Sequence, residues 1–134
     1  MQVNKDTRGF DLPWEREFGY AQAVKVADTI FIAGQVAHDD QGNFVGIGDM
    51  QAQMRAAYRN VGRLLAMYGG TMADLVDETL YVTDIEAAYA AAVACRKEIF
   101  GGNARLASTV VQVQRLTFPE LMIEIRCVAK VAAA

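Results

Sequence analysis

The chain has 134 residues, of which 53% are hydrophobic and 22% are charged, and its formal net charge is −3. This length fits a single domain, residues 1–134, and the high apolar content suggests that other copies of the chain cover part of its surface. Scattered Lys and Arg residues argue against a nucleic-acid partner, and the lack of a long apolar run or a signal-like N-terminus argues against a membrane partner and secretion.

The first predicted elements form a β-hairpin within residues 20–36. Val24 and Val26 alternate in its first strand, Ile30 to Ile32 form an apolar run in its second, and Ala27-Asp28 is the predicted turn. Residues 38–49 follow with three glycines and three aspartates, a composition typical of turns. His38 lies there and is predicted to be a solvated loop residue rather than a base.

Two amphipathic helices are predicted next, each with an aspartate at its N-terminus. The first follows Asp49, extends from residue 50 to 68, and ends at Gly69-Gly70. The second follows Asp84 and ends at Gly101-Gly102. Between them, residues 75–84 alternate as a strand would, with Val76, Leu80 and Val82 expected on one face.

Two more strands complete the chain, at residues 108–113 and 121–131, with a turn around Phe118-Pro119. The element order is βββαβαββ or close to it, which predicts an α+β domain with one sheet and two helices on one of its faces. The strands carry apolar residues on both faces, so the second face needs another cover, and self-association is the simplest source.

The last strand places a carboxylate and a guanidinium on one face, because Glu124 and Arg126 are two residues apart. They could form an ion pair or a solvated stripe. Alternatively, Glu124 could be a general acid or base whose pKa is tuned by partial burial. Tyr20, at the entrance to a strand, could line a pocket or pack in the core. Gly34, directly after a buried strand, could allow close approach of a ligand.

Cysteine and histidine are too sparse to suggest a metal site or a cofactor. Cys95 and Cys127 lack CxxC spacing and neighbouring histidines, so we interpret them as buried or semi-buried thiols in a reducing cytoplasm. His38 is the only histidine, which excludes a multi-histidine metal site.

Four segments together resemble the RidA (YjgF-like) family along essentially the whole chain: "GYAQAV", "IFIAGQVAHDDQGNFVG", "MYGGTMADLVDETLYVTD" and "STVVQVQRLTFPELMIEIRCVA". The resemblance implies a chorismate-mutase-like α+β fold and homotrimers with clefts between subunits. For the active members it also implies hydrolysis of reactive enamines and imines to keto acids and ammonia.

The resemblance also assigns residues to the cleft. Tyr20 matches the tyrosine that lines it, and Glu124 matches the glutamate that helps to position water. Ser108 stands at the position of the arginine that binds the substrate carboxylate. Ala33 replaces the serine before Gly34, and Val93 replaces an asparagine of the second helix.

Two other arginines could supply the missing cation. Arg126 shares a strand face with Glu124, and Arg105 lies three residues upstream of Ser108, an odd spacing that predicts the opposite face. We therefore predict a homotrimer with an intersubunit small-molecule pocket, acting as a hydrolase or deaminase on an imine-like metabolite other than 2-aminoacrylate. The alternative is a non-catalytic binding or regulatory trimer; endoribonuclease activity ranks third.

Overall fold

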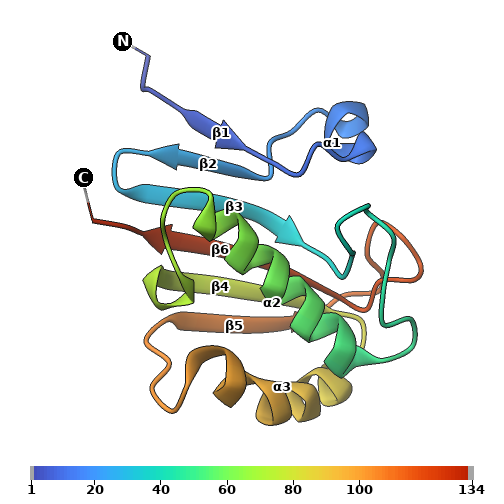
Figure 1. Cartoon of the computed structure of the whole chain (residues 1–134). Helices are drawn as coiled ribbons and strands as arrows, with labels where there is room; N and C mark the ends of the chain where they lie inside the picture. Colours follow the sequence, from blue (N-terminus) through green and yellow to red (C-terminus); the bar gives the residue numbers. More distant parts are fainter. Residues whose placement is uncertain (1, 133–134) are drawn as a thin grey trace.

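The computed structural model describes residues 2–132 as an α+β fold with one mixed six-stranded sheet, in the order β1-β2-β3-β6-β4-β5 (Figure 1). Neighbouring strands are antiparallel except β4 and β5, which are parallel and joined by the helix α3. The elements are β1 (Asp6–Arg8), α1 (Pro13–Phe18), β2 (Ala23–Val26), β3 (Thr29–Gln35), α2 (Met50–Ala66), the 3-10 helix η1 (Met72–Asp74), β4 (Leu75–Val82), α3 (Ile85–Phe100), β5 (Ala107–Gln112) and β6 (Ile123–Lys130).

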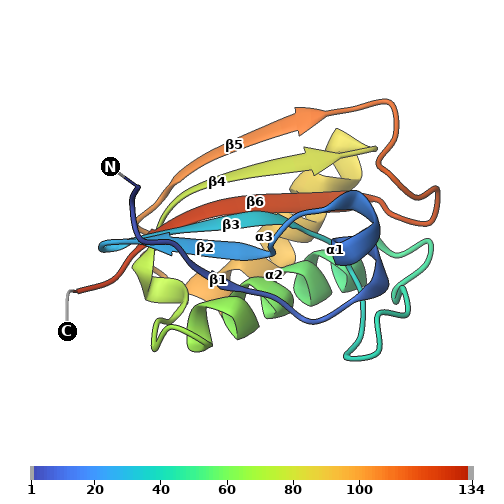
Figure 2. The same cartoon turned by 90° about the horizontal axis from the view of Figure 1, so that it is seen from above.

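Both long helices pack on the same face of the sheet, as predicted (Figure 2). Their N-termini confirm the predicted caps: the side chain of Asp49 accepts a hydrogen bond from the Ala52 amide at 3.1 Å, and Asp84 does the same for Ala87. The apolar side of α2 is buried against the sheet, and includes Met54, Tyr58, Val61 and Leu65. These contacts form the single core of the described residues.

The predicted alternation is confirmed in β6 but is wrong at one residue of β4. Ile123, Ile125 and Cys127 of β6 are buried. In β4, Val76 is 42% exposed, because the register with β6 shifts between Leu75 and Asp77. A bulge of this kind changes which side chains point to the core. Leu75 and Glu78 are therefore the residues that β4 buries ahead of Leu80.

The face of the sheet away from the helices carries an apolar row. Val24, Phe31 and Val128 are cross-strand neighbours on β2, β3 and β6, and Phe31 is 42% exposed. This row belongs to the surface that self-association is predicted to cover. Among the described residues, no helix is both long enough and apolar enough to span a membrane.

The short helices α1 and η1 were not predicted, and neither was the position of β1. The short helix α1 begins with Pro13 at its first position and ends at Gly19, whose φ of 86° is readily adopted by glycine. None of its residues is buried. It lies beside the end of the sheet where β3 finishes (Figure 1).

Candidate functional site

A cavity of about 530 Å³ lies where β3 ends and β6 begins, between α1 and the loop that connects β5 to β6. It brings together four of the residues that the sequence singled out: Tyr20, Ala33, Gly34 and Glu124. Three further aromatic residues, Trp14, Phe18 and Phe118, complete much of its apolar wall. The volume is that of a small-molecule site.

Gly34 and Glu124 depend on one another. A Cβ atom on Gly34 would overlap the carboxyl group of Glu124, so only glycine leaves this side chain where it is. The pairing of β3 with β6 also shifts register between Ile32 and Gln35, at the same place. Bulges often re-aim side chains next to sites. Here the bulge and the glycine together position Glu124 in the cavity.

Glu124 and Tyr20 supply titratable groups whose environments differ from water. Partial burial raises the pKa of the Glu124 carboxyl above its ordinary value, since no charged partner offsets the loss of solvent. Burial also raises the pKa of Tyr20, and the nearby Glu15 charge adds to the effect. Tyr20 thus keeps its proton at neutral pH and can donate a hydrogen bond, while Glu124 can accept or release a proton.

Two buried amide side chains, those of Gln22 and Gln35, line the cavity and are linked by hydrogen bonds. Gln35 donates through Nε2 to Gln22 Oε1 at 2.8 Å and to the Ala33 carbonyl at 3.0 Å. Gln22 in turn donates to Glu15 Oε2 and to the Tyr20 hydroxyl, both at 3.3 Å. Gln22 and Gln35 are 2% and 1% exposed. These bonds fix the orientation of both amides, and they hold Tyr20 in place.

The prediction of a solvated His38 is wrong. The residue is 2% exposed, and its ring lies edge-on to Phe10 and Trp14 at centroid distances of 5.5 and 5.6 Å. Its Nδ1 lies 2.8 Å from the Asp39 carbonyl oxygen, and burial lowers its pKa. The composition correctly predicted a turn, but it could not reveal that aromatic residues distant in sequence enclose the ring.

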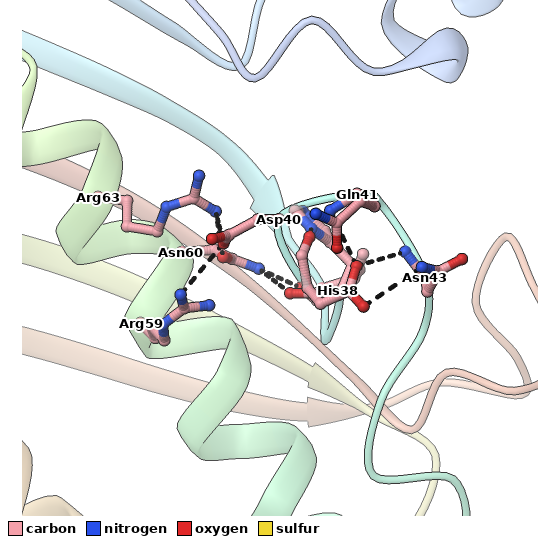
Figure 3. A network of polar contacts seen from close by, with 9 residues as sticks. His38, Asp40, Gln41, Asn43, Arg59, Asn60 and Arg63 are labelled. Carbon is pink, nitrogen blue, oxygen red and sulfur yellow. Dashed lines mark hydrogen bonds and ion pairs between the residues drawn. The ribbon is translucent and has the colours of Figure 1, made fainter.

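The loop that contains His38 is tied to α2 by a polar network (Figure 3). Asn60 of α2 donates to the carbonyl groups of Val36 and His38, at 2.9 and 3.2 Å. Arg59 and Arg63 form ion pairs with Asp40 at 3.1 and 3.2 Å (Figure 3). Because Val36 and His38 line the cavity, this network fixes one of its walls.

Ser108 and Val93 lie apart from the cavity within one chain. The Ser108 hydroxyl donates to Glu78 Oε2 at 2.6 Å, on the side of the sheet that carries the helices. Val93 is 61% exposed on α3. Their predicted roles in binding would therefore need a surface shared with another copy of the chain.

The two candidate arginines are also outside the cavity lining. Arg126 is exposed and donates to the Ile32 carbonyl at 3.4 Å; within residues 2–132 it forms no ion pair with Glu124. Arg105 lines a second, smaller cavity of about 270 Å³ near the start of β4, together with Met72 and Phe100. Glu124 and Arg126 therefore do not form the ion pair that was one of the predicted alternatives.

The sequence reasoning missed a buried charged cluster around Glu78. This carboxylate is fully buried, accepts from the Tyr58 hydroxyl at 2.8 Å, and pairs with Arg96 of α3 at 2.6 Å. Simple alternation from Val76 assigns Glu78 to the core face, but no sequence pattern indicates Tyr58 and Arg96 as its partners. The residues described contain no group of three or more His, Cys, Asp or Glu that could hold a metal ion.

Known proteins share this sequence and this fold. The family model described as Endoribonuclease L-PSP matches residues 15–131. A RutC family protein of Pyrococcus abyssi is 31% identical over 110 residues, which are 82% of this chain and 84% of the relative. The RutC family protein YjgH of Escherichia coli is 33% identical over 84 residues, 63% of each chain.

A solved structure gives the same relationship in three dimensions. A YjgF-family member from Mycobacterium tuberculosis superposes with a TM-score of 0.81 at 29% identity, covering 96% of this chain and all of the other. The match with the family model covers most of the chain, and the fold, the cavity and the sequence resemblance agree with it. The chain therefore belongs to the RidA/YjgF family, whose family model is called Endoribonuclease L-PSP.

Proposed function

We propose that the chain is a hydrolase of the deaminase type, acting on a small enamine- or imine-like compound in the cavity beside Glu124. The observation that carries this proposal is the placement of a partly buried carboxylate, with its pKa raised, in a small-molecule cavity with a tyrosine hydroxyl. A carboxyl group whose pKa is shifted toward neutrality is suited to both accepting and donating a proton.

The proposed chemistry uses one water molecule. Glu124 as carboxylate takes a proton from water while the oxygen attacks the carbon of the protonated imine, which gives a neutral carbinolamine. Glu124 then gives this proton to the nitrogen, the C–N bond breaks as the hydroxyl oxygen forms the carbonyl group, and the hydroxyl proton passes to Glu124, so that a carbonyl compound and ammonia or an amine remain. Tyr20, which keeps its proton, would donate a hydrogen bond to the substrate or to the attacking water.

The homotrimer belongs to the same proposal. The apolar row of Val24, Phe31 and Val128 supports it, since a covered sheet face is expected for such residues. A second subunit could also bring Ser108, Arg105 or Arg126 toward the cavity of its neighbour. Light scattering at micromolar concentration tests this part, and a stable monomer would contradict it.

A direct assay tests the activity. Imines would be generated in solution, and ammonia release would be followed with wild-type protein, Glu124→Gln and Tyr20→Phe. Loss of an acid-base group typically reduces the rate about 10²- to 10⁴-fold, so we expect Glu124→Gln to remove nearly all activity. Glu120→Gln is the matched control, because Glu120 is exposed and lies outside the cavity lining. Activity that is unchanged in Glu124→Gln would contradict the proposed role.

The substrate is proposed to differ from 2-aminoacrylate. Within one chain the cavity lining contains no Lys or Arg, and Ser108 stands where the resemblance calls for an arginine. Little turnover of 2-aminoacrylate is therefore expected. The same observation favours the second candidate, a non-catalytic binding trimer, which would bind ligands in this cavity without releasing ammonia from any imine tested.

Endoribonuclease activity ranks third, although the family model bears that description and a Thermotoga maritima protein with the same fold is described as a putative endoribonuclease. RNA binding depends on neutralising phosphates. The net charge of −3 and two glutamates in the cavity lining work against such contacts.

A further inference from the structure

The cavity has an unusual balance of charge for a site expected to bind a carboxylate. Its lining contains two carboxyl groups, Glu17 and Glu124, and no Lys or Arg among the described residues. The other titratable groups are Tyr20, which keeps its proton, and His38, whose pKa burial lowers, so that it is neutral at physiological pH. Within one chain the lining therefore creates a negative potential that attracts cations and repels anions.

A second, independent feature is an acceptor without a partner. Gln35 lines the cavity and is 1% exposed, yet within the part of the chain described its Oε1 atom has no hydrogen-bond partner. The amide cannot simply be reversed, because Nε2 already donates to two oxygen atoms, Gln22 Oε1 and the Ala33 carbonyl. Buried acceptors of this kind are normally paired. The oxygen is closed to solvent, so its uncompensated partial negative charge adds to the negative potential of the lining.

The apolar part of the lining points to a cation of organic type. Trp14 and Phe118 lie with ring centroids 6.4 Å apart, and Phe18 and Tyr20 are edge-on at 5.7 Å. Aromatic faces attract positively charged nitrogen and also pack against hydrocarbon. An inorganic cation would use little of this surface.

We propose that the cavity binds an organic ammonium or iminium ion, with the charge countered by Glu124 and the carbon skeleton packed on Trp14 and Phe118. The inference rests on the proposed function and adds to it the chemical class of the ligand. A carboxylate on the ligand is then not required for binding.

The fluorescence of a tryptophan residue in the cavity can be used to measure ligand binding. Trp14 is the only tryptophan and lines the cavity, so its fluorescence responds to a ligand bound there. Three probes of matched shape and without interfering absorption would be titrated: cyclohexylammonium, cyclohexanol and cyclohexanecarboxylate. We expect the ammonium ion to bind about tenfold tighter than the carboxylate, the usual scale of one charge-assisted contact.

Variants separate the contribution of Glu124 from a general effect of charge. Glu124→Gln should weaken binding of cyclohexylammonium about tenfold and leave cyclohexanol nearly unchanged. Glu120→Gln removes the same charge outside the cavity lining and should leave both affinities unchanged. Equal losses in the two variants would show that the preference reflects net charge alone, and would overturn the assignment. Circular dichroism would verify that both variants fold.

The outcomes also distinguish this inference from the proposed function. If cyclohexanecarboxylate changes Trp14 fluorescence and binds at least as tightly as the ammonium ion, the ligand class is wrong, but the cavity remains the ligand site. If none of the three probes binds at concentrations up to solubility, the ligand class and the proposed small-molecule site both fail.

Discussion

Two glutamates of this fold are removed from water in contrasting ways. Glu78 on β4 is fully buried, and its oxygen atoms are bound by Tyr58, Arg96 and Ser108. Glu124 on the adjacent strand β6 is partly buried, and its pKa is raised by loss of solvent alone. The first carboxylate is completely paired and so has a structural role. The second has unused capacity to bind, which is what a reactive or ligand-binding group needs.

Breaking the paired cluster should have the largest effect. Arg96→Met removes the guanidinium that lies 2.6 Å from Glu78 and leaves a buried, uncompensated carboxylate. We expect a loss of about 3 kcal/mol in the free energy of unfolding, as for other broken buried pairs. Urea denaturation measures it. The double variant Arg96→Met/Glu78→Gln should recover part of the loss; no recovery would show that Arg96 acts through packing on Phe100 instead.

Ser108→Ala should have a smaller effect on the same cluster. It removes one hydrogen bond to Glu78, while Tyr58 and Arg96 remain, so we expect a loss of about 1 kcal/mol. Ligand affinity, measured through Trp14 fluorescence, should be unchanged if Ser108 serves only Glu78. A clear loss of affinity with unchanged stability would instead support the prediction that Ser108 contributes to ligand binding in an adjacent subunit.

The pH dependence of stability should show the smallest effect, and it sharpens the contrast for Glu124. Its pKa is higher in the folded chain than in the unfolded chain, so the folded state binds the proton more tightly. Stability should therefore fall as pH rises from the ordinary carboxyl pKa to the raised one, and then remain level. Tyr20, Glu17, Tyr81 and Arg126 share its surroundings.

Denaturation curves across this pH range would compare wild type with Glu124→Gln. The difference between their unfolding free energies should change in that window alone. A difference that does not vary with pH would mean that Glu124 titrates as an ordinary solvated carboxyl group.

The sequence predicted the helices and most strands well because their signals are local. Asp49 and Asp84 cap their helices through contacts three residues away, and the alternation in β6 is visible without any partner strand. Within the site, Tyr20, Gly34 and Glu124 were each singled out from local patterns, and the family resemblance then placed Tyr20 and Glu124 in one cleft. His38 and Val76 were misjudged because burial of the ring and the bulge in β4 depend on segments distant in sequence. The open acceptor of Gln35 has no sequence signal, since it results from where two other oxygen atoms lie.

The network between α2 and the loop after β3 has a consequence for how the cavity exchanges its contents. Asn60 binds two carbonyl groups of that loop, and the Val45 amide donates to the Ala37 carbonyl, so this wall can open only together with contacts of the central helix. Amide hydrogens there should exchange with solvent slowly. Another wall is α1, whose Trp14 packs against His38 and Phe44 of that loop. None of the six residues of α1 is buried, and Phe18 at its end is 84% exposed. We therefore expect a ligand to enter and leave past the exposed Phe18 end of α1 rather than through the loop after β3.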